Sequence, residues 1–406
     1  MSRKREKFFT GWQMKTIADK NIPYAGEAFS EFGDVVLKDG RDITAGDVRN
    51  ADILLVRTVT HVGEELLRDS KVQYIGTATI GYDHIDTGYL RKRKIHFSSA
   101  AGCNANSVAE YIVSALYVLS GRYGLNLQNV TLGIIGAGNV GSKVIEKARA
   151  LDIEVLINDP PKERATGQNI YQPLERVLKE SDIISFHVPL TFDGQDATYR
   201  MGNHGLFSKM KEGAFVINTS RGPVIHTHAL LSALYHGNVR SAVIDVWEGE
   251  PVIPMELLDC IDIGTPHIAG YSRDGKVNAT KILYREACRL FNNEPRWQSR
   301  DLPPPEHPVI TYTENGYDPG ATIGAIIKKA YDIERDDRAL RMMISVPKKE
   351  RSRYFDRLRN EYPVRREFNS IKVETNREND RVQSVLKALG FQLNKAHTSH
   401  ESKELQ

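Results

Sequence analysis

The sequence predicts an α/β protein with two doubly wound parallel sheets, followed by a small C-terminal α+β domain. Two observations support this prediction. Short apolar runs rich in β-branched residues alternate with amphipathic segments through the first 270 residues, which is typical of successive parallel βα units. After Trp297 this alternation stops, and residues 301–308 contain four prolines, which indicates a linker.

The composition is that of an ordinary globular chain and excludes several classes of protein. Across 406 residues, 55 Lys and Arg nearly balance 52 Asp and Glu, so the basic excess of a nucleic-acid or membrane-surface protein is missing. No apolar stretch approaches the roughly 20 residues that cross a bilayer, and no signal peptide is expected after the basic start. Cys103, Cys260 and Cys288 lie far apart, which favours a reducing cytoplasm over a disulfide framework.

The first quarter of the chain is expected to form one sheet and then a long helix. Ser107 and Glu110 have the spacing of a capping box, apolar residues then recur at helical intervals, and Gly121 is the expected stop. This helix would carry the chain from one domain into the next. The strands expected before it are Lys15–Ala18, Asp34–Leu37, Ile53–Val56, Val72–Ile75 and Ile95–Phe97.

Six further apolar runs predict the second sheet. They begin roughly 20 to 30 residues apart, about the length of one βα unit, and they are continuously apolar, as are strands covered on both faces. They are Val130–Ile135, Ile153–Ile157, Ile183–Val188, Ala214–Asn218, Ala242–Val246 and Ile261–Ile263. Beyond the prolines, helices are expected at Ala321–Tyr331, Glu350–Glu361 and Asp380–Leu389, and strands at Met342–Val346 and Ile371–Glu374.

Residues 136–141 match the G-x-G-x-x-G pattern of a dinucleotide-binding turn, between an expected strand and an expected helix. Gly136 would permit the tight turn, Gly138 the approach of a pyrophosphate, and Gly141 the packing of helix on strand. Asp159 lies 18 residues after Gly141 (159 − 141), where it would bind the adenosine ribose and favour NAD over NADP. The competing interpretation is a glycine-rich turn without a ligand.

Other polar clusters follow the ends of successive expected strands. They are Val188-Pro189, residues 218–222, Asp245 and residues 265–267. In a parallel sheet these ends lie along one edge, where ligands of open α/β sheets bind. The clusters are therefore expected to converge around the dinucleotide.

Two side chains of these clusters, together with Glu250 from residues 245–251, suit acid–base chemistry on a carboxylate substrate. Arg221 presents a guanidinium that can hold a carboxylate in a bidentate fork, unless it belongs to a structural ion pair. His267 suits proton exchange near neutral pH, although a lone histidine is more often a satisfied core or loop residue. Glu250 could fix the tautomer of His267, or it could be a solvated acid.

Other features suggest weaker sites. His226 and His228 lie near His204 without a further ligand at metal-binding spacing, so no metal site is expected. Cys103 is interpreted as a small buried residue. Residues 348–366 carry eight basic side chains, which predict a solvated helix face or, as a sharper hypothesis, an anion contact across a subunit interface.

Taken together, the motifs resemble the D-2-hydroxyacid dehydrogenase superfamily. The resemblance rests on the glycine-rich fingerprint with Asp159, then on residues 218–223, 245–251 and 266–267. It narrows to a branch that carries an extra C-terminal domain and oxidises a phosphorylated 2-hydroxy acid in bacterial pyridoxal phosphate biosynthesis. The narrower resemblance rests on residues 21–25, 56–60, 76–81, 101–111, 246–251 and 263–271, and it covers roughly Met14 to the C-terminus.

The resemblance implies three groups of site residues. Arg221, Glu250 and His267 would form the catalytic set. Thr58, Thr79 and Tyr271 would contact the substrate. We add Arg57 as the candidate for its phosphate, with a C-terminal-domain arginine of the partner subunit as a second candidate. The implied NAD contacts are Gly136, Gly138, Asn139, Val140, Gly141, Asp159, Val188, Pro189, Thr219, Ser220, Arg221, Asp245 and Gly270.

The resemblance also implies a domain organisation. A flavodoxin-like substrate-binding domain would span residues 14–105, completed by about 270–298, and a Rossmann NAD-binding domain would span 106–269. A dimerisation domain would follow at 299–406, and residues 1–13 would be an N-terminal extension. The substrate, a small phosphorylated 2-hydroxy acid, would bind in a cleft between the first two domains.

We therefore expect a cytoplasmic homodimer joined through the C-terminal domains, with no nucleic-acid or membrane partner. Two alternatives stay open. One is another D-2-hydroxyacid dehydrogenase, of the phosphoglycerate or glyoxylate and hydroxypyruvate type. The other is an NAD-sensing corepressor on the same fold.

Overall fold

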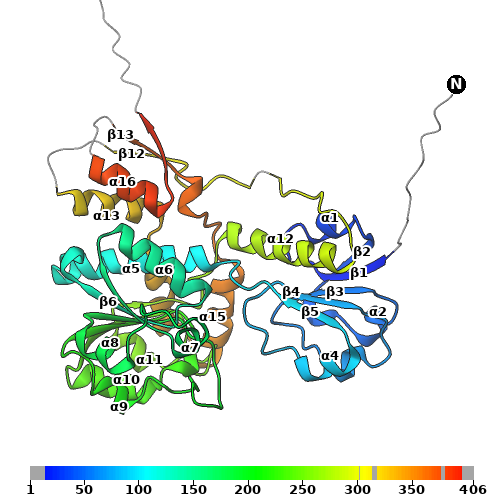
Figure 1. Ribbon diagram of the computed structural model, residues 1–406, viewed down its shortest axis with the longest axis horizontal. Coiled ribbons are helices and arrows are strands. Elements are labelled where there is room, and N and C mark those ends of the chain that lie inside the picture. Colours follow the sequence, from blue (N-terminus) through cyan, green and yellow to red (C-terminus); the bar gives the residue numbers. More distant parts are fainter. Residues whose placement is uncertain (1–13, 301, 313–317, 376–379, 396–406) are drawn as a thin grey trace, which may run out of the picture. The chain divides into compact units, whose positions relative to one another are not determined.

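The computed structural model describes residues 14–300, 302–312, 318–375 and 380–395, and it divides into two compact units (Figure 1). The first unit contains residues 14–103 and 274–302, apart from 301. The second contains residues 104–273 and the described residues from 303 onward. No helix among the described residues is long and apolar enough to cross a membrane.

The first unit contains a five-stranded parallel sheet in the order β2-β1-β3-β4-β5, which is the flavodoxin-like order. The prediction of five strands is confirmed, although β4 begins two residues later than expected. The strands are β1 (Met14–Asp19), β2 (Gly33–Lys38), β3 (Ile53–Val56), β4 (Tyr74–Thr77) and β5 (His96–Ser99). The helices are α1 (Ala25–Phe29), α2 (Ala45–Val48), α3 (Glu64–Leu67), α4 (Thr87–Arg93) and, from much later in the chain, α12 (Arg273–Leu290).

Helix α12 completes the core of the first unit. The Tyr74 hydroxyl donates to the carbonyl oxygen of Leu283 at 3.1 Å. A Cβ built on Gly76 would lie 3.1 Å from the Leu283 side chain, so the glycine lets the helix pack closely on the sheet. The rings of Phe29 and Phe32 meet Tyr284 edge-on at 6.1 Å, which adds aromatic contacts to the apolar burial.

The second unit contains a six-stranded parallel sheet in the order β11-β10-β9-β8-β6-β7. Ile157 also forms a single parallel bridge with Tyr171, so a reduced strand lies beside β7, where the Rossmann order places its third strand. The chain order reverses between β6 and β8, which makes this the switch point. The strands are β6 (Thr131–Ile135), β7 (Glu154–Asn158), β8 (Ile183–Phe186), β9 (Ala214–Asn218), β10 (Val239–Ile244) and β11 (Ile263–Gly264).

Helices cover both faces of this sheet, which explains why its strands are continuously apolar. Helices α5 and α6 lie on one face, and α8, α10 and α11 lie on the other (Figure 1). The helices are α5 (Ala105–Tyr123), α6 (Asn139–Ala150), α7 (Pro160–Thr166), α8 (Leu174–Glu180), α9 (His204–Phe207), α10 (Thr227–Tyr235) and α11 (Met255–Cys260).

The predicted ends of helix α5 were wrong. The helix begins at Ala105 with Asn104 as N-cap, so Ser107 lies inside it. It passes through Gly121 and ends at Gly124, which adopts the left-handed φ of 66°. The serine and glutamate of the apparent capping box instead bind a segment about 260 residues away, a partner that local spacing cannot reveal.

The described residues of the C-terminal region form a three-stranded parallel sheet with four α-helices. Helices α13 and α16 pack against each other and against α5 and α6 (Figure 1). The strand predicted at Met342–Val346 was wrong, because residues 342–345 continue α14 as a 3-10 helix. Strands β12 and β14 and helix α14 were not predicted. The elements are β12 (Val309–Tyr312), β13 (Lys372–Thr375), β14 (Gln392–Lys395), α13 (Pro319–Ala330), α14 (Ile333–Arg341), α15 (Arg351–Asn360) and α16 (Asp380–Leu389).

A buried polar cluster joins this region to α5 and to the loop after β11. Arg365 is 7% exposed and donates to the carbonyl oxygens of Ser107 (2.6 Å) and Ala269 (3.1 Å). The Ser107 hydroxyl donates to Glu367 at 2.6 Å, and Glu367 is itself buried. Because buried charges are costly unless they are paired and hydrogen-bonded, these contacts tie the two segments together specifically.

The same cluster extends to α6. Lys147 is buried and donates to the carbonyl oxygen of Leu389 at 2.7 Å, while its ammonium lies 4.0 Å from Glu110. Glu110 accepts the backbone N–H of Phe368 at 3.0 Å. Burial raises the pKa of Glu110, and burial lowers the pKa of Lys147, although their mutual attraction opposes both shifts.

Candidate active site

The glycine-rich turn lies where β6 ends and α6 begins, at the switch point of the sheet. Gly136 adopts a φ of 91°, and a Cβ there would lie 2.9 Å from the carbonyl group of His187. A Cβ on Gly141 would lie 2.0 Å from the carbonyl oxygen of Gly136, so glycine alone allows the helix to approach the turn. At Gly138, by contrast, a Cβ would meet no other described residue within 4 Å. Close packing therefore explains the glycines at positions 136 and 141. At Gly138 the backbone is left uncovered by other described residues.

The first turn of α6 offers backbone N–H groups to a ligand. Asn139, Val140 and Gly141 are its first residues, and the first N–H groups of a helix have no acceptor within the helix. They also carry the positive end of the helix dipole. The turn thus has the open backbone and the donors that a pyrophosphate requires.

Asp159 lies beside this turn, directly after β7. Its Oδ2 accepts the N–H of Ala137 at 2.8 Å, and its Oδ1 accepts the N–H of Lys162 at 3.0 Å, in the first turn of α7. The carboxylate is thus fixed in place, and each oxygen keeps a second lone pair for a ribose hydroxyl. Its role in binding ribose stays a prediction.

The ends of β8 and β9, which pair with each other, carry the next predicted residues. Val188 and Pro189 follow β8, while Thr219 and Ser220 follow β9. The Ser220 hydroxyl donates to Asn218 Oδ1 at 2.8 Å. Thr219 Oγ1 is buried and has no hydrogen-bond partner among the residues that the structure describes. Because an unpaired buried hydroxyl is costly, a polar ligand at this edge would stabilise it. Together with the open turn, this residue set fits a dinucleotide.

His267 and Glu250 form the pair that the sequence predicted. Glu250 Oε2 lies 2.8 Å from His267 Nδ1, and Glu250 Oε1 accepts the N–H of Trp247 at 2.7 Å. Burial opposes the charged form of Glu250, but His267, these hydrogen bonds and nearby Arg359 together hold the pKa of Glu250 below its ordinary value. The His267 side chain is 35% exposed, and the described residues offer no partner to its Nε2. An ionised carboxylate therefore orients an imidazole whose other nitrogen is available.

The backbone around His267 is held in an unusual conformation. His267 adopts a left-handed φ of 57°, which is uncommon for a residue other than glycine. Its N–H donates to the carbonyl oxygen of Asp245 at 2.8 Å. The Asp245 carboxylate accepts the N–H groups of Ile268 (2.7 Å) and Ala269 (3.0 Å) and the hydroxyl of Thr265 (2.6 Å). These contacts stabilise the conformation that presents His267.

Asp245 is therefore a support for the histidine loop in this structure. It is 1% exposed, and burial raises its pKa even though His267 and its hydrogen bonds oppose the shift. Its predicted contact with NAD stays a prediction. The sequence placed Asp245 correctly at the end of β10, but the N–H groups that it accepts became visible only with the loop conformation.

Arg221 follows β9 and is half-buried. Its Nη1 donates to the carbonyl oxygen of Ser220 at 2.7 Å, and no carboxylate of the described residues lies within 4.0 Å. The competing interpretation as a structural ion pair therefore does not hold for the described part of the chain. The next residue, Gly222, lies against Trp247, because a Cβ there would be 2.0 Å from the Trp247 carbonyl oxygen. Arg221 is thus linked through Trp247 to the pair of Glu250 and His267.

Gly270 and Tyr271 continue the histidine loop. A Cβ on Gly270 would lie 1.9 Å from Asn104 Nδ2, so the side chain of the α5 N-cap requires a glycine here. Tyr271 is half-buried, and its ring meets that of Tyr362 edge-on at 5.9 Å. Their predicted contacts with NAD and with substrate, respectively, stay predictions.

Sequence reasoning offered a C-terminal-domain arginine of the partner subunit as a phosphate ligand, but it did not single out Arg359. It belongs to the basic run at residues 348–366, for which a solvated face was the default interpretation. That interpretation fits the exposed Arg353 and Arg357, but it was wrong for the buried Arg365. Arg359 donates from Nη2 to the Tyr271 hydroxyl at 3.2 Å, which places it at the histidine loop. The available signal was Phe355, which is buried and lies one helical turn before Arg359 on the same face.

His187 is a second residue that sequence reasoning missed. It follows β8, its Nε2 lies 2.9 Å from Ser185 Oγ, and its Nδ1 is buried without a partner among the described residues. Burial lowers the pKa of His187 to about 3. The imidazole is therefore neutral at physiological pH and suits a structural role beside the glycine-rich turn.

Three predicted substrate residues lie in the first unit, where β3 and β4 end side by side. Arg57 Nε donates to Asp19 Oδ2 at 2.9 Å, and the Asp19 side chain is fully buried. The Thr79 hydroxyl lies 2.7 Å from that of Thr77 and donates to the carbonyl oxygen of Gly81 at 2.8 Å. Thr58 lies in the turn after Arg57. Arg57, Thr58 and Thr79 thus lie along one edge of this sheet, and their binding roles stay predictions.

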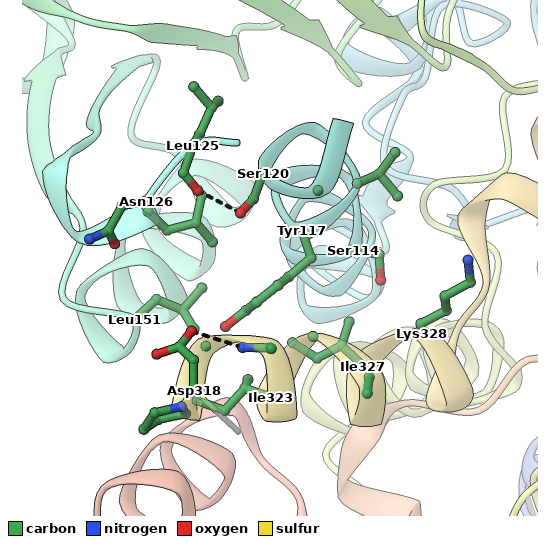
Figure 2. A pocket seen from close by; sticks show the side chains of 18 of the residues that line it. Ser114, Tyr117, Ser120, Leu125, Asn126, Leu151, Asp318, Ile323, Ile327 and Lys328 are labelled. Atoms are coloured by element: carbon green, nitrogen blue, oxygen red, sulfur yellow. Dashed lines mark hydrogen bonds between the residues drawn. The ribbon is translucent and has the colours of Figure 1, made fainter. Parts of the chain in front are cut away.

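A cavity of about 770 Å³ lies elsewhere in the second unit, beside α5 and α13 (Figure 2). Three of its charged residues are paired: Arg122 with Asp262 and Glu334 at 2.9 Å, and Lys328 with Glu334 at 2.8 Å. Figure 2 shows the Ser120 hydroxyl donating a hydrogen bond to the carbonyl oxygen of Leu125. It also shows the Asp318 carboxylate capping the start of α13. None of the predicted site residues lines this cavity, so it is distinct from the candidate active site.

The histidines near residue 226 do not form a metal site in the described part of the chain. The rings of His226 and His228 lie 5.8 Å apart, and those of His204 and His226 lie 6.4 Å apart. The part of the chain that the structure describes contains no group of three or more His, Cys, Asp or Glu residues that could hold a metal ion.

Two sequence families match the chain. Residues 110–269 match the D-isomer specific 2-hydroxyacid dehydrogenase NAD binding domain. Residues 302–390 match a domain of unknown function, DUF3410. The first match contains the glycine-rich turn and the catalytic candidates, and the second contains Arg359.

Solved structures with this fold include NAD-bound dehydrogenases. The D-lactate dehydrogenase of Aquifex aeolicus, complexed with NAD and lactic acid, is 26% identical with a TM-score of 0.56, and the match covers 68% of this chain and 95% of that one. The NAD-bound 3-phosphoglycerate dehydrogenase of Entamoeba histolytica is 26% identical with a TM-score of 0.58, covering 71% and 99%. Both match nearly their whole length, and both leave much of this chain unmatched.

Curated relatives match almost the whole chain. The erythronate-4-phosphate dehydrogenase of Bacteroides fragilis is 44% identical over 89% of this chain and 99% of its own length. That of Proteus mirabilis is 40% identical over 93% of this chain and 99% of its own length. Together with the Rossmann sheet and the glycine-rich turn, these matches identify an NAD-dependent dehydrogenase. The chain belongs to the erythronate-4-phosphate dehydrogenase family, within the D-isomer specific 2-hydroxyacid dehydrogenases.

Proposed function

We propose that the protein oxidises 4-phospho-D-erythronate at C2, with NAD as acceptor, to (R)-3-hydroxy-2-oxo-4-phosphobutanoate. The observation that carries the chemistry is the His267 imidazole, whose Nδ1 is 2.8 Å from Glu250 and whose Nε2 is available. The choice of substrate is supported by the names of relatives that match over their full length. As the resemblance implies, the product would enter bacterial pyridoxal phosphate biosynthesis.

The proposed reaction divides the work among three side chains. Arg221 binds the substrate carboxylate in a bidentate fork, which orients C2. His267 Nε2 accepts the proton of the C2 hydroxyl, and Glu250 stabilises the resulting imidazolium through Nδ1–H. NAD held at the glycine-rich turn of residues 136–141 would supply the hydride acceptor for C2. The C2–H and O–H bonds break, the carbonyl forms, and the products are the 2-oxo acid, NADH and one proton.

The test is NADH formation with purified protein and NAD. We expect a much higher kcat/KM for 4-phosphoerythronate than for 3-phosphoglycerate at equal concentrations. A preference for 3-phosphoglycerate, or for glyoxylate and hydroxypyruvate in the reverse direction, would reassign the substrate within the superfamily. Absence of turnover with every acid would favour the NAD-sensing alternative.

We also propose a cytoplasmic homodimer joined through the C-terminal region. The support is a group of exposed apolar side chains in that region, Met342, Ile344 and Val364, which are 55–60% exposed in the single chain. The three cysteines are free, which suits a reducing compartment. Light scattering on the purified chain tests the dimer, and a mass of about 46 kDa, that of one chain, would contradict it.

A further inference from the structure

We propose that Arg359 binds the phosphate group of the substrate, so that the C-terminal segment sets the preference for a phosphorylated acid. This inference rests on the proposed function and names a residue outside the predicted site. The group that binds the phosphate would then come from the additional C-terminal segment of the chain.

Arg359 lies at the histidine loop. Its Nη2 donates to the Tyr271 hydroxyl at 3.2 Å, and its Cζ lies 5.8 Å from the centroid of that ring. Tyr271 is four residues after His267, and its N–H donates to the carbonyl oxygen of Ile268 at 2.8 Å. The positive charge of Arg359 is one of the causes that hold the pKa of Glu250 low. The guanidinium is therefore within electrostatic range of the catalytic pair.

Little of the hydrogen-bonding capacity of Arg359 is used. A guanidinium has five N–H donors, yet the bond to Tyr271 is the single hydrogen bond found for this side chain among the described residues. Its Nε is buried without a partner, and no described carboxylate lies within 4.0 Å of it. A half-buried cation whose Nε is enclosed without a partner among the described residues is costly unless an anion completes it.

Arg341 provides the contrast within the same region. Its Nε binds Asp337 at 2.9 Å, its Nη1 donates to the carbonyl oxygen of Leu258, and its Nη2 donates to that of Ile261. All three nitrogens are thus satisfied inside the chain, as expected of a structural arginine. Arg359 has no such set among the described residues, as expected if a ligand completes it.

The position of Arg359 in the sequence suits a phosphate further from C2. It lies in residues 302–390, outside the NAD-binding match, and the Entamoeba 3-phosphoglycerate dehydrogenase covers 71% of this chain with 99% of its own length. The phosphate of 4-phosphoerythronate is one carbon further from the reacting carbon than that of 3-phosphoglycerate. An arginine from an additional segment could supply a cation at that greater distance.

The main test compares two substrates that differ by the phosphate. For Arg359→Met, we expect kcat/KM for 4-phosphoerythronate to fall about 100-fold or more, because charge-assisted hydrogen bonds to the phosphate are lost. The value for unphosphorylated D-erythronate should change less than about threefold. Arg359→Lys should recover part of the loss, because the charge remains without the fork.

Arg357→Met is the matched control. Arg357 is exposed on the same helix, two residues away, and its Cζ lies over the Tyr354 ring at 5.0 Å. The control removes the same charge and should leave the ratio of the two kcat/KM values unchanged. Equal losses for both substrates in Arg359→Met and Arg359→Lys would overturn the proposal and indicate that Arg359 acts through Glu250 or Tyr271.

Inorganic phosphate provides a second measurement that does not depend on the assigned substrate. It should inhibit the wild type competitively against the acid, and the inhibition constant should rise at least tenfold in Arg359→Met but not in Arg357→Met. If the wild type failed to oxidise 4-phosphoerythronate, the proposed function would fail. The phosphate inhibition, measured with whichever acid is oxidised, would still decide the role of Arg359.

Discussion

The strand ends of the two parallel sheets carry similar polar residues but differ in how these are satisfied. In the first unit, Arg57 is paired with the buried Asp19, and the Thr79 hydroxyl donates to a backbone carbonyl. In the second unit, Arg221 has no carboxylate among the described residues, and Thr219 Oγ1 is buried without a partner. The two parallel sheets therefore differ in the unused hydrogen-bond donors and acceptors that their strand ends leave for a ligand.

This difference predicts which residues should affect catalysis when they are mutated and which should mainly affect stability. Side chains with an unused donor or acceptor contribute to a reaction directly, whereas satisfied side chains mainly hold their own segment in place. We therefore expect large kinetic effects in the second unit and effects dominated by stability in the first.

The largest effect is expected for His267→Asn. The substitution removes the proton acceptor, so kcat should fall about 10²- to 10⁴-fold, the usual contribution of general base catalysis. Steady-state oxidation of 4-phosphoerythronate near neutral pH measures it. His236→Asn, at an exposed position, is the control. Full activity in His267→Asn would exclude proton transfer through this residue.

A loss of about 100-fold in kcat/KM is expected for Arg221→Ala, because two charge-assisted hydrogen bonds to the carboxylate are removed. The loss should appear with every 2-hydroxy acid that the enzyme oxidises, phosphorylated or not. Arg353→Ala removes an exposed arginine and should behave as wild type. An unchanged kcat/KM in Arg221→Ala would show that the carboxylate binds elsewhere.

Glu250→Gln should lower kcat about 10- to 100-fold, because a neutral amide stabilises the imidazolium less. It should also change the dependence of stability on pH. Since the folded protein holds the pKa of Glu250 below its ordinary value of 4.5, the ionised pair contributes stability above that pH and loses it as the pH falls further. Urea unfolding from pH 7 to 3 should therefore show the advantage of wild type over Glu250→Gln shrinking below pH 4.5. A constant difference would contradict the pairing.

The smallest kinetic effect is expected for Arg57→Met. Loss of the partner leaves Asp19 buried and unpaired, so the free energy of unfolding should fall by about 1–3 kcal/mol. Any loss in kcat/KM specific to the phosphorylated substrate should stay below tenfold, smaller than that of Arg359→Met. If Arg57→Met lost more kcat/KM for the phosphorylated substrate than Arg359→Met did, Arg57 would be the main phosphate ligand.

Much of the fold was predictable because its signals are local. Continuous apolar runs identified the strands of both sheets, and the end of β9 at Asn218 was predicted to the residue. The segment at Met342–Val346 was predicted wrongly because most of it, including the β-branched Ile344, continues a helix that is buried on one side. The helix start at Ser107 failed for another reason, since its hydroxyl bonds to Glu367, far away in the sequence.

The candidate site was predictable where it follows strand ends. Arg221 and the pair of Glu250 and His267 were found this way, and the structure confirms the pairing at 2.8 Å. A C-terminal-domain arginine was predicted as a possible phosphate ligand, but Arg359 could not be singled out among the basic residues. Its importance depends on α15 lying at the histidine loop and on the absence of a carboxylate beside it in the described structure. A basic run in the sequence does not show which of its arginines will pair with a carboxylate, because such partners come from distant segments that only the fold brings together.

The buried cluster of Arg365, Glu367, Ser107, Glu110 and Lys147 has a consequence for how such a chain can be shortened. A dehydrogenase trimmed to the length of its lactate-oxidising relatives would lose the groups that satisfy Ser107 and Glu110 and would open the apolar side of α5 to water. The additional C-terminal segment is therefore needed for the stability of the nucleotide-binding unit. An ancestor or a designer could remove it only by rebuilding the surface of α5 at the same time.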